Sequence, residues 1–373
     1  MPQNKQTELL KELIVMSNRY GSDPDLVLAG GGNTSAKDSE TLYVKASGTS
    51  LATITEDGFV AMDRGQLEGI LKKEYPSNDK EREAAFLEDV LAAKSNPADT
   101  KRPSVEALLH NLFPHRFVLH LHPALVNGLT CGVNGEEIAK ALFSDEALWV
   151  EECRPGYTLA KLCNDRMNDY FQKFGKHVRV LLLQNHGVFF AGDTLEQIDE
   201  LLNKVMSRLK DKIVREPDLS SVAVDGAVVK EMGKRLSALN GSIVIHGAHA
   251  DAMKFSADAQ SVAPLLEPFT PDHIVYCKAH PLYIDNIENM SEDYKDFRSK
   301  NGYDPKIVIV KGMGYFALGT SEKDAKTAKM LFDDAMKIAV YSESFGGQRH
   351  MAEDMVNFIT NWEAESYRQS QNK

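Results

Sequence analysis

Apolar positions along the chain repeat with a helical period in some segments and form short continuous runs in others. Residues 5–20 place apolar side chains three and four positions apart, which predicts an amphipathic helix. The runs at 117–123 (FVLHLHP) and 177–190 (HVRVLLLQNHGVFF) are the most apolar and predict buried strands. A helix-start signal and an apolar stripe follow in 192–210. Strands that alternate with helices indicate an α/β fold around a mixed sheet.

The glycine-rich segment GGGNTS at 30–35 lies between two short apolar runs, at 26–28 and 42–44, which predict strands. By its composition alone, the segment is best interpreted as a tight hairpin turn. Residues 102–113 (RPSVEALLHNLF) predict a further helix, with Ser104 as its N-cap.

The second half of the chain repeats the pattern of the first. The strand, glycine–aromatic turn and capped helix of 177–209 have a counterpart in 304–338, and 114–126 resembles 271–284. Any two strand–turn–helix units look partly alike, but two matched segments in the same order favour a duplicated α/β domain. This alignment pairs three histidines of the first half with residues of the second: His120 with Lys278, His122 with His280, and His186 with Met313.

A mixed, proline-containing segment at 212–226 marks the expected boundary between the two copies. We therefore expect one domain over residues 1–215 and a degenerate, structural repeat over residues 216–373. The second copy keeps the signals of the fold and loses most of the polar residues. A duplicated domain with a single working site would have this pattern.

Composition narrows the class of protein. The net charge of -11 and the pI of about 5.5 argue against a nucleic-acid-binding face. The first 20 residues lack the apolar core of a signal peptide, and no run reaches the ~18 continuous apolar residues of a membrane span. The four cysteines form no CxxC pair, which is typical of reduced thiols. We therefore expect a cytoplasmic protein that binds neither nucleic acid nor membranes.

Three histidines and one glutamate are the candidate chemistry of the first half. His120 and His122 alternate along a predicted strand, so both point to one face, while His186 ends the next apolar strand. Glu106 lies on the helix before the first strand. Three neutral imidazoles suit Zn²⁺ and leave one coordination position open for substrate or water. A His-x-His pair by itself, however, is more often structural. Other histidines of this half are interpreted as packing or surface residues: His110, His115 and His177.

Five motifs occur in a fixed order along the chain: GGGNTS, KASGT, RPSVEALLH, HLHP and QNHGV. Together they resemble the class II aldolase/adducin family. The closest resemblance is to the aldolase part of bifunctional rhamnulose-1-phosphate aldolase/alcohol dehydrogenase proteins, and it extends over essentially the whole chain. It implies α/β/α layers around a mixed sheet. The motifs are more specific for the family than for the reaction.

The resemblance implies a role for each of the four residues. In the family, the histidines that match His120, His122 and His186 bind one divalent metal ion per chain, usually Zn²⁺. The glutamate that matches Glu106 acts as acid and base. Such a metal stabilises the enediolate of an aldol cleavage while the carboxylate moves the proton. Desolvation would raise the pKa of that carboxylate, and the cation would lower it.

The resemblance also implies a phosphate-binding site. Glycine-rich turns expose backbone N–H groups, and a serine at a helix start adds the dipole of the helix. The residues that match the phosphate site of the family are Asn33, Ser47, Gly48 and Ser104.

Two positions depart from the pattern of the family. Val105 stands where some sugar-phosphate aldolases have a second serine. Glu152 stands where the long relatives have a tyrosine, the residue that often protonates the leaving alkoxide in this family. Glu152 and Tyr157 are therefore alternative sources of that proton.

Three functions compete. The first is a metal-dependent lyase that cleaves a ketose 1-phosphate to dihydroxyacetone phosphate and an aldehyde. The second is epimerisation or dehydration of a sugar phosphate at the same site, but epimerases of the family tend to have aspartate in place of Glu106. The third is a non-catalytic scaffold, as in adducin, which the three retained histidines disfavour. Relatives with one domain are commonly tetramers, so we expect a homo-oligomer.

Overall fold

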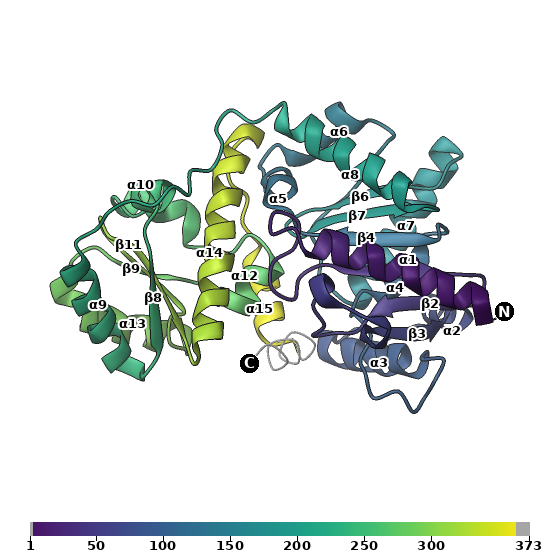
Figure 1. Ribbon diagram of the computed structural model, residues 1–373, viewed down its shortest axis with the longest axis horizontal. Coiled ribbons are helices and arrows are strands. Elements are labelled where there is room, and N and C mark those ends of the chain that lie inside the picture. The colour runs from purple at the N-terminus through teal and green to yellow at the C-terminus, as the bar shows by residue number, and fades with distance from the viewer. Residues whose placement is uncertain (1–2, 363–373) are drawn as a thin grey trace. The chain divides into compact units, whose positions relative to one another are not determined.

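The computed structural model describes residues 3–362, and the chain folds into two compact units. The first unit contains the residues up to 126 and 136–211, and the second contains 127–135 and the residues from 212 on. Each unit has its own sheet, and Figure 1 labels several strands of each. Among the described residues, no helix combines the length and the apolar character that a membrane crossing requires.

The first unit is built on a seven-stranded sheet with the order β3-β2-β1-β4-β7-β6-β5. Neighbouring strands are antiparallel except for β5 and β6, which are parallel, so the sheet is mixed as predicted. The strands are β1 Asn33–Lys37, β2 Thr41–Lys45, β3 Phe59–Asp63, β4 Phe117–Leu121, β5 Leu148–Val150, β6 Val180–Leu183 and β7 Gly187–Gly192.

Helices cover both faces of this sheet, which confirms the predicted α/β class. The apolar sides of α2, α3, α4 and α7 form one core with the strands, and α1 and α8 pack on the sheet outside that core (Figure 1). Val118 and Phe189 point into this core from β4 and β7. The helices of the chain up to residue 211 are α1 Gln3–Gly21, α2 Arg64–Ile70, α3 Asp79–Ala92, α4 Ala107–Leu112, α5 Ala124–Thr130, α6 Gly135–Phe143, α7 Tyr157–Phe174 and α8 Leu195–Lys210, with 3-10 turns at Leu51–Thr53 and Glu56–Gly58. Residues 127–130 of α5 and the first residue of α6 belong to the second unit.

Two local predictions in this unit were wrong. Residues 26–28 form no strand, and β1 begins instead inside the glycine-rich segment, because Asn33 pairs with His120 of β4. Pairing with a distant strand here outweighs the local composition that favoured a turn. Ser104 is not an N-cap, since α4 begins only after Glu106. The Ser104 hydroxyl accepts a hydrogen bond from the N–H of Glu106 at 3.2 Å, which shapes the turn before the helix.

The second unit contains a four-stranded sheet with the order β8-β11-β10-β9. Apolar side chains of α9 and α13 form a core with these strands, and α14 packs on β8 and β11. The strands are β8 Ile243–Gly247, β9 Leu282–Ile284, β10 Ile307–Val310 and β11 Gly314–Gly319. The helices are α9 Gly226–Asn240, α10 Ala250–Phe255, α11 Ala259–Val262, α12 Pro271–Cys277, α13 Met290–Asn301, α14 Glu322–Ser342 and α15 Glu353–Thr360, with 3-10 turns at Ala263–Leu265, Ile287–Asn289 and Glu343–Phe345.

The two sheets share one pairing pattern. The order β4-β7-β6-β5 in the first unit matches β8-β11-β10-β9 in the second, with two antiparallel pairs followed by one parallel pair in each. The register agrees as well. His120 lies opposite Phe189, the third residue of β7, and His246 lies opposite Phe316, the third residue of β11.

This register corrects part of the sequence alignment. Residues 271–277 form helix α12, not a strand, so they are no counterpart of β4. A short, fully buried apolar run does not distinguish a helix from a strand, which explains the error. The residue in the place of His120 is His246, not Lys278, and the residue in the place of His122 is Ala248, not His280. The alignment of His186 with Met313 agrees with the strands, since each precedes the first glycine of its strand.

Candidate metal centre

Three histidines meet at one end of the first sheet. His120 and His122 lie at the end of β4, and His186 lies in the turn between β6 and β7. One ring nitrogen from each histidine lies within 4.8 Å of the other two. The Nε2 atoms of His120 and His122 are 2.8 Å apart. The pairing of β4 with β7 brings the strand histidines next to the turn histidine, as the predicted alternation requires.

Hydrogen bonding and packing orient His120 for ligation. Its ring is fully buried, and burial keeps the pKa of the imidazole well below its usual value, so the ring is neutral. Nδ1 lies 3.0 Å from the carbonyl oxygen of Val188 and must donate to it. The lone pair of the ring is therefore on Nε2, the atom that faces His122. Phe189 stacks under the ring at 4.0 Å and 19°.

Gly187 leaves the space in which the histidines meet. A Cβ atom at this position would lie 2.5 Å from the carbonyl oxygen of Leu121 and 2.6 Å from Cδ2 of His122. Both distances are shorter than real Cβ contacts, so any side chain would displace β4 or the imidazole. The glycine of the QNHGV motif thus leaves room for the three histidines to meet.

Glu106 faces the cluster from the residue before α4. Its side chain is buried, with Oε2 3.3 Å from Nε2 of His120 and Oε1 3.3 Å from Nε2 of His186. Burial by itself would raise the pKa of this carboxyl. Positive charge on the neighbouring imidazoles when they are protonated, together with a hydrogen bond from Asn33, outweighs burial and lowers the pKa of this carboxyl. The carboxylate is therefore ionised beside the histidines.

A buried chain of hydrogen bonds holds Glu106 in place. Nδ2 of Asn33 donates to Oε2 of Glu106 at 2.6 Å, and Oδ1 of Asn33 bonds to Nε2 of His110. Nδ1 of His110 lies 2.7 Å from the hydroxyl oxygen of Ser35. His110 was interpreted from sequence as a packing or surface residue. It is fully buried and connects β1 to Glu106; its position four residues after Glu106, one turn along a helix, was the available signal.

The four residues assigned to phosphate binding have different surroundings. Ser47, Gly48 and Ser104 come from two segments that run side by side, since the N–H of Ser47 bonds to Arg102 and the N–H of Ser104 to Lys45, both at 2.9 Å. Gly48 has a φ of 83°, a conformation that favours glycine. The carboxamide of Asn33, by contrast, is engaged by Glu106 and His110.

The two alternative proton donors lie near β5. Glu152 follows that strand and is half-buried. Tyr157 begins α7, and its ring packs against those of Tyr75 and Phe86 at 4.5 and 5.8 Å. The Tyr157 hydroxyl donates to the carbonyl oxygen of Lys73 at 3.3 Å, so in this conformation it is directed at the protein backbone.

The donor set fits a divalent metal ion of the Zn²⁺ type. Three imidazoles converge, one of them is fixed in the tautomer that presents Nε2, and a carboxylate stands beside them. His120, His122 and His186 would hold the ion. A hydrogen bond from the ring nitrogen that faces away from the metal, like that from His120 to Val188, is typical of histidine ligands.

Comparison with known proteins agrees with these motifs. Residues 11–204 match the family of the class II aldolase and adducin N-terminal domain. A Bacillus subtilis (strain 168) protein named uncharacterized oxidoreductase YuxG is 24% identical over 411 residues. That alignment covers 96% of this chain and 58% of the relative, so the chain spans less than two thirds of the length of that protein.

Two solved structures show the extent of structural similarity. The N-terminal class II aldolase domain of a conserved Thermoplasma acidophilum protein is 27% identical, covers 54% of this chain and 92% of its own, and has a TM-score of 0.46. An L-fuculose-1-phosphate aldolase from Thermus thermophilus is 17% identical, covers 53% and 92%, and has a TM-score of 0.34. The family match itself extends over more than half of the chain and contains all three histidines and Glu106. This chain therefore belongs to the family of the class II aldolase and adducin N-terminal domain.

Proposed function

We propose that the chain is a metal-dependent aldolase that cleaves a ketose 1-phosphate to dihydroxyacetone phosphate and an aldehyde. The observation that carries this proposal is the position of Glu106, whose carboxylate oxygens lie 3.3 Å from the ring nitrogens of His120 and His186. An ionised carboxylate next to three converging imidazoles combines a base with a cation site. Together they can move the proton and stabilise the negative charge that develops when a carbon–carbon bond beside a ketone is cleaved.

His120, His122 and His186 would hold one divalent ion, with Zn²⁺ the expected one, and when bound the ion supplies Lewis-acid stabilisation of the enediolate oxygens. In the cleavage direction, the hydroxyl of the aldol carbon gives its proton to the ionised Glu106 as the carbon–carbon bond breaks, and that carbon becomes the aldehyde. The bonding electrons pass to the enediolate. Glu106 then delivers a proton to the carbon next to the ketone, and in condensation it removes this proton again.

The resemblance to rhamnulose-1-phosphate aldolases makes rhamnulose 1-phosphate the first substrate to test. The phosphate would lie on Ser47, Gly48 and Ser104, where two backbone turns and a buried hydroxyl come together. Asn33 would contribute once its amide leaves Glu106, because that amide now bonds to the carboxylate. Arrival of substrate would thus release Glu106 for proton transfer.

The test is product detection from a panel of ketose 1-phosphates with Zn²⁺-loaded protein. We expect dihydroxyacetone phosphate, and we expect Glu106→Gln to lower kcat by about 10²–10⁴-fold with metal content retained. Conversion of a pentulose 5-phosphate without cleavage would instead identify an epimerase. Bound metal without turnover of any sugar phosphate would contradict both enzymatic functions and favour an adducin-like scaffold.

We further propose that the second unit is a degenerate copy of the first and has no metal site of its own. The shared strand order and register support this proposal. Of the three ligand positions only one keeps histidine, namely His246 in the place of His120. Ala248 and Met313 stand in the places of His122 and His186. One metal ion per chain is the expected stoichiometry, and two ions per chain would contradict the proposal.

A further inference from the structure

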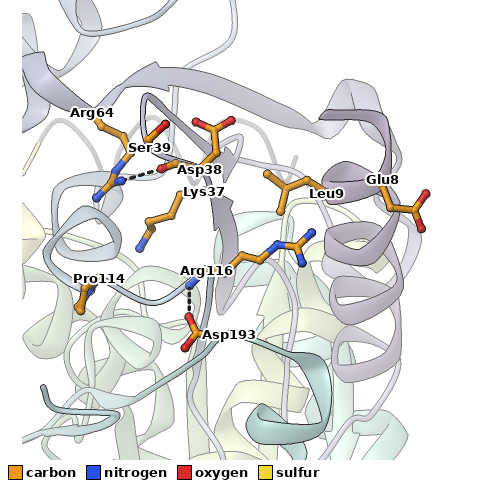
Figure 2. Close-up of a pocket in the computed structure, with 9 residues that line it drawn as sticks. All are labelled: Glu8, Leu9, Lys37, Asp38, Ser39, Arg64, Pro114, Arg116 and Asp193. Carbon is orange, nitrogen blue, oxygen red and sulfur yellow. Dashed lines mark hydrogen bonds between the residues drawn. The ribbon is translucent and has the colours of Figure 1, made fainter. Parts of the chain in front are cut away.

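A cavity lies at the end of the strands opposite the candidate metal centre (Figure 2). Its volume is about 640 Å³, and residues at the end of β1 and around the start of β4 line it. β1 begins at Asn33, beside Glu106, and ends at Lys37, which lines the cavity. The four steps of strand between these residues span roughly 13 Å. The cavity is therefore separate from the metal centre.

Two cations of this cavity have no carboxylate partner among the described residues. Arg64 donates from Nε to Oδ1 of Asn111 at 2.9 Å and from NH1 to the backbone oxygen of Asp38 at 2.6 Å. Lys37 donates to the backbone oxygens of His110 and Phe113 at 2.5 and 2.8 Å. Neutral groups alone therefore satisfy both side chains.

The two cations also act on each other. Burial, and then the charge of Arg64, lower the pKa of the Lys37 ammonium well below its usual value, and the smaller opposite effect of the Asp193 carboxylate does not offset them. In Figure 2 both side chains extend into the same region, above Pro114. An anion placed between them would relieve the repulsion and stabilise the charged form of Lys37.

The carboxylates that line the cavity form no direct ion pair with Lys37 or Arg64 among the described residues. Oδ1 of Asp38 accepts two backbone N–H groups, those of Glu40 and Thr41. Oδ1 of Asp193 accepts the backbone N–H of Arg116 at 3.1 Å. Glu8 is exposed, and Figure 2 shows its carboxylate directed away from Lys37 and Arg64. Arg116, the third cation of the lining, pairs with Glu12 at 2.6 Å, so Lys37 and Arg64 are the lining cations without an ion pair among the described residues.

The form of the cavity indicates the class of ligand. The Arg64 guanidinium has five N–H donors and uses two, which leaves three for a planar, bidentate contact with phosphate or carboxylate oxygens. The volume of 640 Å³ suits an organic molecule rather than a bare ion. Leu9 and Pro114 offer apolar contact, and the exposed Asp193 carboxylate can accept from hydroxyl groups. We propose that this cavity binds a small, hydroxylated phosphate monoester, with its phosphate on Arg64 and Lys37.

Binding of glycerol 3-phosphate, inorganic phosphate and glycerol to the metal-loaded full chain tests this proposal by titration calorimetry. Ser104→Ala is the background in every arm, because it weakens the phosphate site proposed beside the metal. We expect glycerol 3-phosphate to bind most tightly, inorganic phosphate less tightly and glycerol not at all. Arg64→Gln should raise the Kd for glycerol 3-phosphate about tenfold or more, since charge-assisted hydrogen bonds are lost.

Two further variants distinguish a loss of ligand binding from a folding defect in Arg64→Gln. Ser39→Glu places a negative charge on the exposed lining without removing a contact, and it should also raise the Kd. Arg166→Gln removes an equal charge outside the cavity, where Arg166 pairs with Glu151, and it should leave the Kd unchanged. An unchanged Kd in both Arg64→Gln and Ser39→Glu would overturn the proposal. So would inorganic phosphate binding as tightly as the ester. Neither outcome depends on aldolase activity.

Discussion

At the scale of single residues, the environment of each imidazole decides its role. His120 is buried, stacked on Phe189 and fixed by Val188, so it presents Nε2 to the cluster. His110 is also fully buried, but both of its ring nitrogens bond to side chains of β1. The residue type is the same, and the hydrogen-bond partners distinguish the proposed ligand His120 from the proposed positioning residue His110.

Removal of a ligand histidine should remove the metal. We expect His122→Ala and His186→Ala to lower metal content to near zero under dialysis against buffer, as measured by elemental analysis. His246→Asn is the matched control, because His246 occupies the strand position of His120 in the second unit. Metal loss in His246→Asn, or full retention in His186→Ala, would contradict the assignment.

Loss of His110 should disturb the carboxylate and leave the metal in place. His110→Phe leaves Oδ1 of Asn33 without its bond, which costs about 1–3 kcal/mol of local stability and loosens Glu106. We expect kcat to fall by about ten- to a hundredfold with little change in KM, by analogy with residues that orient metal ligands. His110→Gln, which retains a donor and an acceptor, should recover part of kcat. Equal loss in both variants would indicate a purely structural role.

At the scale of elements, the hairpin of β6 and β7 forms the cluster by bringing a turn residue next to β4. Gly187→Ala should lower the free energy of unfolding by about 1–3 kcal/mol through overpacking and should weaken metal binding, because the new Cβ meets His122 and the backbone of β4. Gly69→Ala in α2 is the control, since no atom lies within 4 Å of its Cβ position. Chemical denaturation and metal titration measure both effects; equal stability of the two variants would contradict this steric account.

Most elements could be predicted, and the errors occurred where distant pairing determined the conformation. The periodicity of 5–20 and 192–210 predicted α1 and α8, since an amphipathic stripe is a local signal. The strand at 33–37 escaped prediction because NTSAK has a weak strand signal and is fully buried only by its neighbours β2 and β4. Helix α12 was predicted as a strand because its apolar run is short and buried on all sides, a pattern that strands and helices share.

At the scale of the whole molecule, the two compact units should respond differently to metal. The two tryptophans of the chain, Trp149 and Trp362, belong to the first and the second unit respectively. With Trp362→Phe, the fluorescence of Trp149 reports the first unit alone, and Trp149→Phe does the same for the second. Ligand binding stabilises only the unit that holds it, by about 2.7 kcal/mol at a free concentration of a hundred times Kd.

Chelation should therefore lower the Tm reported by Trp149 and leave the Tm reported by Trp362 unchanged. Added Zn²⁺ should restore the first value. A common shift of both transitions would show instead that the units unfold together. If chelation lowered the Tm of the second unit alone, the proposed location of the metal centre would be contradicted.

The sequence by itself determined the family, the α/β class and the four residues that form the candidate centre, because motifs and periodicity are local properties of the chain. Tertiary structure decided three other things. Strand register placed His246, not Lys278, at the position of β8 that matches His120 of β4. The packing of the segment around α4 against β1 placed His110 within hydrogen-bond distance of Asn33. The fold also placed Lys37 and Arg64 around one cavity, although nothing in the sequence indicates that these two residues are neighbours. Each depends on contacts between distant segments, which composition and spacing do not encode.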